Sequence, residues 1–197
     1  RLLRRPVFLH AVGVGPVRHA LSRRMIRRIF QWATYSSLRE ADANTWFPKN
    51  PRPVFADPVF ANQVAAAPLR TGRTITIGVA LKKYSTGNFL PMLAGIISEL
   101  RREYHLQVLY LPFELPRGAR LVSELAGRFT INLVVVEDPA EIYRRYDDLD
   151  CLVAMNYHAL AVAIQKQVPF IALSYDPKVG GLVRDVLPGT IIFPEEL

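Results

Sequence analysis

The stretch CLVAMNYHALAVAIQKQVPFIALSYDPKVGGL, residues 151–182, decides the fold class that this sequence predicts. It alternates a short apolar run, a segment with helical periodicity, a second apolar run and a second helical segment. Short continuous apolar runs are typical of strands in a parallel sheet that is buried on both faces. Two polar residues stand where these strands end: His158 at the start of one predicted helix, and Lys178 at the start of the next.

The same alternation extends back from this stretch to residue 75, and a last short strand is predicted at 190–193. Further predicted strands cover residues 75–81, 106–113 and 131–138, and further predicted helices cover residues 89–104, 119–129 and 140–149. Strands and helices that alternate at this spacing predict an α/β fold with a parallel sheet.

The amino-terminal part of the chain has a different pattern. Residues 7–15 are an apolar run that predicts a buried strand, and apolar residues with helical spacing predict an arginine-rich helix over residues 18–33. This change of pattern predicts two domains, over residues 1–68 and 75–197, joined by a linker over 69–74. Because the sequence begins in mid-pattern at Arg1, we expect it to be a piece of a longer protein.

Composition limits the class of protein and its partners. The 197 residues are 50% hydrophobic and 21% charged, which is typical of a globular protein. The net charge of +8 allows nucleic acid, anionic lipid or phosphorylated small molecules as partners. The single cysteine excludes a disulfide framework and a cysteine-based zinc site. We expect a cytoplasmic protein whose arginine-rich helix allows peripheral contact with the inner face of a membrane.

Cationic and proton-transfer groups follow the carboxyl ends of the predicted strands, where open α/β sheets bind their ligands. These residues are Arg39, Lys82, His158 and Lys178, and the neutral amide of Asn156 stands two residues before His158. Helix amino termini lie at the same edge, and their free N–H groups favour anions. This pattern predicts a ligand that carries a phosphate or a carboxylate.

Five short motifs then occur in a fixed order along the chain. They are Gly13-Val-Gly-Pro-Val-Arg18, Ser37-Leu-Arg39-Glu40, Ala56-Asp57-Pro58-Val-Phe60, Met155-Asn-Tyr-His158-Ala-Leu160 and Val168-Pro-Phe-Ile-Ala-Leu-Ser-Tyr175-Asp-Pro-Lys178. This order resembles the polysaccharide pyruvyl transferase family. The resemblance implies a GT-B-like fold of two Rossmann-like domains with parallel sheets. It makes residues 1–68 the carboxyl-side part of a first domain that is truncated at its amino end, and residues 75–197 the second domain, which carries His158 and Lys178. It also implies phosphoenolpyruvate as donor substrate, and as acceptor a sugar of an exopolysaccharide or cell-wall glycan, often on a lipid carrier.

The resemblance also implies roles for particular residues. The functional arginine, histidine and lysine of the family fall on Arg39, His158 and Lys178, which we predict to be catalytic. For donor binding we predict Arg39, Lys82, Lys178 and Asn156, although Asn156 stands where the family often has an arginine. His158 suits general acid/base work, Arg39 suits two-point binding of a carboxylate or phosphate, and Lys178 suits a departing phosphate. The scheme needs no cofactor and no metal.

Two other hypotheses use the same sequence features. One is a glycosyltransferase of the same fold that uses a nucleotide sugar, with Glu137 and Lys178 in its donor site. The other is a non-catalytic module that binds nucleic acid or membrane through the arginine-rich helix. The sequence does not favour nucleic acid as a partner, because it shows neither a recognised nucleic-acid-binding fold nor an interleaved set of aromatic residues.

Overall fold

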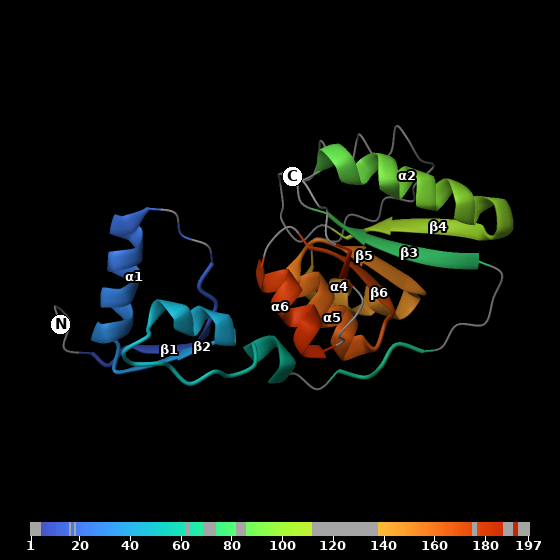
Figure 1. Ribbon diagram of the computed structural model, residues 1–197. Coiled ribbons are helices and arrows are strands. Elements are labelled where there is room, and N and C mark those ends of the chain that lie inside the picture. Colours follow the sequence, from blue (N-terminus) through green and yellow to red (C-terminus); the bar gives the residue numbers. More distant parts are fainter. Residues whose placement is uncertain are drawn as a thin grey trace. The chain divides into compact units, whose positions relative to one another are not determined.

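The chain forms two compact units, Arg1–Asn62 and Gln63–Leu197, in a computed structural model (Figure 1). The structure describes residues 5–15, 17, 19–61, 64–68, 74–81, 86–111, 138–174, 177–186 and 191–192. Each unit contains a sheet of parallel strands. The unit boundary precedes the predicted 69–74 linker, of which only Thr74 is described, as the first residue of a strand.

The first unit is built on one strand–helix–strand element. Strand β1 (Phe8–Val12) and strand β2 (Tyr35–Leu38) pair in parallel, and helix α1 (Ala20–Trp32) connects them. A bridge between Leu38 and Val54 adds one further parallel contact. Two 3-10 helices follow β2, namely η1 (Ala41–Trp46) and η2 (Pro58–Ala61).

Helix α1 uses only part of its apolar surface to cover this small sheet. Phe30 is buried and packs in one cluster with Leu38 and Phe47, the two aromatic rings lying 4.8 Å apart at their centroids. Other apolar residues of the first unit stay exposed, including Leu21 at 70% and Phe8 at 65%. The buried strand predicted at residues 7–15 is therefore buried only in part.

The second unit alternates strands and helices along a five-stranded sheet of order β4-β3-β5-β6-β7. Its elements are β3 (Thr74–Ala80), α2 (Thr86–Glu103), β4 (His105–Tyr110), α4 (Pro139–Arg145), η4 (Tyr146–Asp148), β5 (Cys151–Ala154), α5 (Tyr157–Lys166), β6 (Phe170–Leu173), α6 (Pro177–Val186) and β7 (Ile191–Ile192). The helix predicted at 119–129 and the strand predicted at 131–138, except Asp138, lie outside the described residues. All the pairings are parallel, as the near-continuous apolar strands predict.

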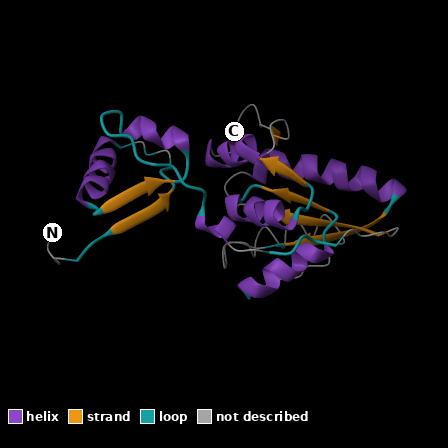
Figure 2. Cartoon of the chain, turned by 90° about the horizontal axis from the view of Figure 1, so that it is seen from below, coloured by secondary structure: helices purple, strands orange, loops and turns teal. Residues whose placement is uncertain are grey.

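The two faces of this sheet carry different helices. Ile77 and Val79 of β3 belong to a core cluster that includes Leu93 and Ile97 of α2. Successive strand residues point to opposite faces, so Gly78, between them, faces the other side, where a Cβ would meet Leu149. Figures 1 and 2 show helices on both sides of the sheet, with α2 on one side and α5 and α6 on the other. The predicted α/β fold with parallel sheets is confirmed.

Candidate functional site

The candidate site of the second unit lies at the carboxyl edge of its sheet. Strands β5 and β6 are neighbours in parallel register, with Ala154 opposite Ala172. Helix α5 begins at Tyr157 after β5, and α6 begins at Pro177 after β6. Neighbouring parallel strands end at the same edge of a sheet, so the amino-terminal ends of both helices lie there. This edge therefore presents backbone N–H groups that favour an anion.

His158 is the second residue of α5, and its side chain is exposed. Asn156 caps the helix, because its Oδ1 accepts a hydrogen bond of 3.0 Å from the backbone N–H of His158. The imidazole also lies edge-on to the ring of Tyr157, with centroids 5.6 Å apart. An accessible imidazole on a capped helix is well placed to exchange a proton with a ligand at this edge.

A buried tyrosine anchors the helix that carries His158. The hydroxyl of Tyr146 donates a hydrogen bond of 2.9 Å to the carbonyl oxygen of Ala159. Tyr146 is completely buried, and this burial, with a smaller contribution from Tyr143, raises its pKa well above the ordinary value for tyrosine. Tyr146 therefore stays a neutral donor. Its role was not apparent from sequence, where it is one aromatic residue in the charged segment 140–149.

The two lysines predicted for the site are only partly covered by the structure. Lys178 is the second residue of α6, so its backbone lies at the carboxyl edge of the sheet, but its side chain is outside the described residues. Lys82 also lies outside them, just beyond Leu81, which follows β3. Ala80 at the end of β3 pairs with Ala154 at the end of β5. The described backbone thus brings His158 and Lys178 to one edge.

The order of the strands adds a reason to expect a ligand here. Strand β3 lies between β4 and β5. After β3 the chain adds β4 on one side of it, and it later adds β5, β6 and β7 on the other side. Ligands of open α/β sheets bind in the crevice outside the carboxyl ends of the strands at such a switch point. Met155 and Asn156 follow β5 directly at this position, and both are buried.

Arg39 belongs to the first unit, where it follows β2 and makes two ion pairs. Its Nε lies 2.6 Å from Oε1 of Glu40, and its Nη1 lies 2.6 Å from Oδ2 of Asp57. All three side chains are largely buried. The sequence does not identify Asp57 as a partner of Arg39, although Asp57 belongs to the motif Ala56-Asp57-Pro58-Val-Phe60. These carboxylates offset the charge that Arg39 would offer an anion.

Gly13 makes room for the Arg39 side chain. Gly13 follows β1, and a Cβ built on it would lie 2.9 Å from Cζ of Arg39, closer than real Cβ contacts allow. The guanidinium therefore packs directly over the Gly13 backbone. A Cβ built on the nearby Gly15 would have no atom within 4 Å. In the Gly-Val-Gly-Pro motif, the first glycine thus has a specific packing role.

No three or more His, Cys, Asp or Glu side chains among the described residues are grouped so that they could hold a metal ion. Within the same residues, no helix combines the length and the apolar character needed to span a membrane.

Solved structures resemble this fold at low sequence identity. One is a crystal structure of accessory secretory protein 1, 2 and 3 in Streptococcus pneumoniae, with a TM-score of 0.50 and 13% identity over 77% of this chain and 33% of that one. Another is Methanocaldococcus jannaschii UDP-GlcNAc 2-epimerase in complex with UDP-GlcNAc and UDP, with a TM-score of 0.53 and 13% identity over 89% of this chain and 55% of that one. This chain thus spans about a third and about half of their lengths. These neighbours have GT-B-type folds, which confirms the predicted fold class.

A search of curated proteins found no match. The sequence model of the family described as polysaccharide pyruvyl transferase matches residues 1–177. Arg39 and His158 lie inside this match, and Lys178 is the residue that follows it. The match covers most of the chain, and it identifies the same family that the order of the five motifs in this sequence resembles. This chain therefore belongs to the polysaccharide pyruvyl transferase family, a family of transferases that modify glycans.

Proposed function

We propose that this protein transfers a pyruvyl group from phosphoenolpyruvate to a sugar of an exopolysaccharide or cell-wall glycan and forms a pyruvate ketal. The observation that carries the proposal is the shared sheet edge at which α5 and α6 begin, with His158 and Lys178 as their second residues. Membership of the family supports the reaction class. In this proposal the enzyme works at the cytoplasmic side of the membrane, where a lipid-linked acceptor is accessible.

The reaction assigns a distinct task to each group. Two sugar hydroxyls form C–O bonds to the central carbon of phosphoenolpyruvate, whose bond to the phosphate oxygen breaks. Of the two hydroxyl protons released, one balances the proton gained by the methylene carbon and the other leaves with phosphate. His158 moves these protons as general acid and base. Lys178 and the amino termini of α5 and α6 stabilise the charge on the leaving phosphate.

Donor binding needs further cations and a defined backbone. Lys82 follows β3 at the switch point and contributes a point charge to the donor phosphate in this proposal. Asn156 contributes by fixing the first turn of α5, since its Oδ1 is bonded to the His158 N–H. Arg39, which pairs with Glu40 and Asp57, is the group that we assign to the donor carboxylate, because a guanidinium can bind a carboxylate at two points.

The test uses the full-length protein with phosphoenolpyruvate and a panel of glycans. We expect release of inorganic phosphate and a glycan with the added mass of a pyruvate ketal. His158→Gln should abolish both products without loss of folding, because the side chain is exposed. The matched control is His105→Gln, since His105 is exposed and begins β4 at the opposite edge of the sheet. Full activity of His158→Gln would show that the assignment of the general acid is wrong.

A glycosyltransferase that uses a nucleotide sugar is the rival function. A structural neighbour of this chain is an epimerase in complex with UDP-GlcNAc and UDP, and this gives the rival a specific basis. A ligand that binds only the folded protein raises its melting temperature. We expect phosphoenolpyruvate to raise it and UDP-sugars to leave it unchanged. The reverse preference, together with release of UDP, would support the rival.

A further inference from the structure

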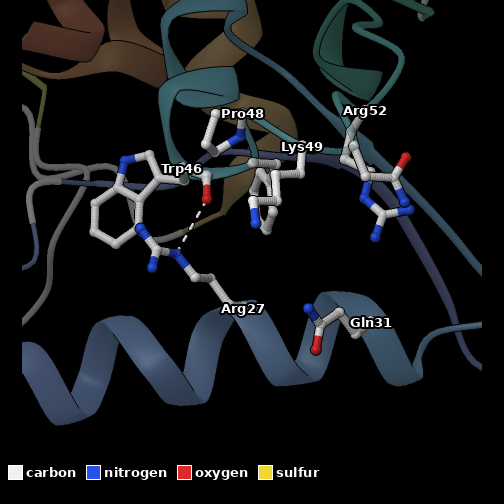
Figure 3. A pocket seen from close by; sticks show the side chains of 8 residues that line it. Arg27, Gln31, Trp46, Pro48, Lys49 and Arg52 are labelled. Atoms are coloured by element: carbon white, nitrogen blue, oxygen red, sulfur yellow. Dashed lines mark hydrogen bonds between the residues drawn. The ribbon is translucent and has the colours of Figure 1, made fainter.

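A pocket of about 250 Å³ lies within the first unit, between α1 and the segment from Trp46 to Arg52 (Figure 3). Arg27 and Gln31 line it from the helix, and Lys49 and Arg52 line it from the opposite segment. Its volume is smaller than the roughly 300–1,000 Å³ of typical drug-sized sites, so it suits a small group. Arg39 and its carboxylate partners do not line it.

The charge of this pocket is uniform among the residues that the structure describes. Three of its lining side chains are cations, Arg27, Lys49 and Arg52, and none of its described lining residues is acidic. Arginine side chains at a protein surface are commonly paired with carboxylates, as Arg39 is here. Three cations that line one pocket, without a carboxylate among its described lining residues, give it a positive charge that an anion would neutralise.

Hydrogen bonds hold the side chain of Arg27 and the backbone of Arg52 in place. The Nε of Arg27 donates a hydrogen bond of 3.1 Å to the carbonyl oxygen of Trp46, which fixes the arginine against the end of η1. The backbone of Arg52 is bonded twice to the Asn44 side chain, at 2.7 Å through its N–H and 3.0 Å through its carbonyl. Pre-organised arginines lose little side-chain entropy when they bind a ligand.

The Arg52 guanidinium has an unmet hydrogen-bonding requirement. It lies over the ring of Phe47, with Cζ 5.9 Å from the centroid. Its Nε is buried and has no hydrogen-bond partner within the described part of the chain. A buried donor without a partner is destabilising. Because Nε is covered, a ligand in the pocket would bond to the terminal N–H groups of Arg52. Among protein ligands, phosphate oxygens match the forked donors of arginine in charge and geometry.

We propose that this pocket binds a phosphoryl group, and that the group is attached to a ring or chain that packs against the Trp46 and Pro48 side chains at its rim. The site is separate from the sheet edge of the second unit and does not depend on the proposed transfer reaction. Two sources share this chemistry, namely a soluble phosphate ester or diphosphate and the head group of an anionic phospholipid.

The test measures the binding of inorganic pyrophosphate to the full-length protein by calorimetry at constant ionic strength. Loss of one charge-assisted contact weakens binding by roughly ten-fold or more. We expect this loss for Arg52→Gln and for Lys49→Gln, and the exposed Lys49 makes the second variant safe for folding. The control is Arg24→Gln, which removes the same charge from α1 outside the pocket.

Pyrophosphate affinity that is unchanged in both Arg52→Gln and Lys49→Gln would overturn the proposal. Equal weakening by Arg24→Gln would also overturn it, since it would reflect general charge. Sedimentation with vesicles then distinguishes the two sources. Co-sedimentation with anionic phospholipid vesicles that is lost in Lys49→Gln and retained in Arg24→Gln would support the site with a head group as ligand. Binding of pyrophosphate without co-sedimentation would support it with a soluble phosphate.

Discussion

Asn156 and His158 are joined by a hydrogen bond of 3.0 Å from the His158 backbone N–H to the Asn156 side chain, at the first turn of α5. The residue that departs from the common arginine of the family is therefore the cap of the helix that carries the candidate general acid. Asparagine is among the strongest helix caps, so this position has a structural reason to be Asn whatever it does for a ligand.

Asn156→Ala removes this cap and should lower the free energy of unfolding by about 1 kcal/mol. Asn156→Asp should keep most of the stability, because a carboxylate oxygen can accept the same hydrogen bond. Urea unfolding followed by circular dichroism measures both variants. Equal stability of Asn156→Ala and the unmodified protein would mean that the cap contributes nothing.

Gly13→Ala should destabilise the first unit by about 1 kcal/mol, because the new Cβ would displace the Arg39 guanidinium from its two carboxylates. Gly15→Ala is the control, since its Cβ meets no atom within 4 Å. A double-mutant cycle with Arg39→Ala tests the cause. The cost of Gly13→Ala should disappear when Arg39 is absent, and a cost that persists would locate the strain elsewhere.

Gly78→Ala should destabilise the second unit by about 1–3 kcal/mol, since its Cβ would lie 2.7 Å from Cδ1 of Leu149 and 3.0 Å from Cδ1 of Leu152 in a packed core. Gly95→Ala in α2 places its Cβ in open space and should stabilise the helix by up to about 1 kcal/mol. Thermal unfolding of the two variants should therefore shift in opposite directions. A stabilising Gly78→Ala would contradict the packing described for β3.

The stability of the protein should fall in alkaline solution through Tyr146. Burial raises the pKa of Tyr146 in the folded state. The contribution of Tyr146 to the free energy of unfolding is therefore fully present below the ordinary tyrosine pKa of about 10, and it is lost as pH rises through the higher folded value. Tyr146→Phe should lower the free energy of unfolding by about 1 kcal/mol at neutral pH, because the hydrogen bond is lost. The same variant should lose less stability than the unmodified protein above pH 10.

Urea unfolding between neutral pH and about pH 11 measures this effect, because the ordinary tyrosine pKa lies within that interval. Tyr104→Phe is the control, since Tyr104 is 44% exposed. If the free energy of unfolding falls by the same amount at alkaline pH in Tyr146→Phe and in the unmodified protein, a group other than Tyr146 causes the fall.

Cys151 should react slowly with thiol reagents in the folded protein. Burial raises its pKa. A backbone hydrogen bond at Leu152 offsets part of this rise, and the nearby Asp150 carboxylate adds a smaller rise. The thiolate is the reactive form, so less of it is present at neutral pH. As the single cysteine, it gives an unambiguous mass change on alkylation. Labelling rates that are equal in the folded and the urea-unfolded protein would contradict this environment.

Sequence periodicity predicts local elements well where burial is complete. The strands around residues 75–81 and 151–156 are continuous apolar runs because helices cover both faces of the sheet, and their ends locate the edge that carries His158. The same periodicity predicts a buried strand over residues 7–15, but Phe8 in this strand is exposed, because an apolar sequence does not show what packs against the strand. It also cannot pair Arg39 with Asp57, since this contact depends on the path of a proline-rich loop.

The position of β3 between β4 and β5 has a consequence for synthesis of the protein. Ile77 pairs with Cys151, roughly 70 residues later in the chain, so β3 lacks one neighbour while the ribosome makes the intervening segment. At about 5–20 residues per second, this takes roughly 4–14 s. During that interval the nascent chain presents an unpaired apolar strand edge, which can pair with other chains. We expect chaperones that bind nascent chains to reduce aggregation of this protein before β5 has emerged.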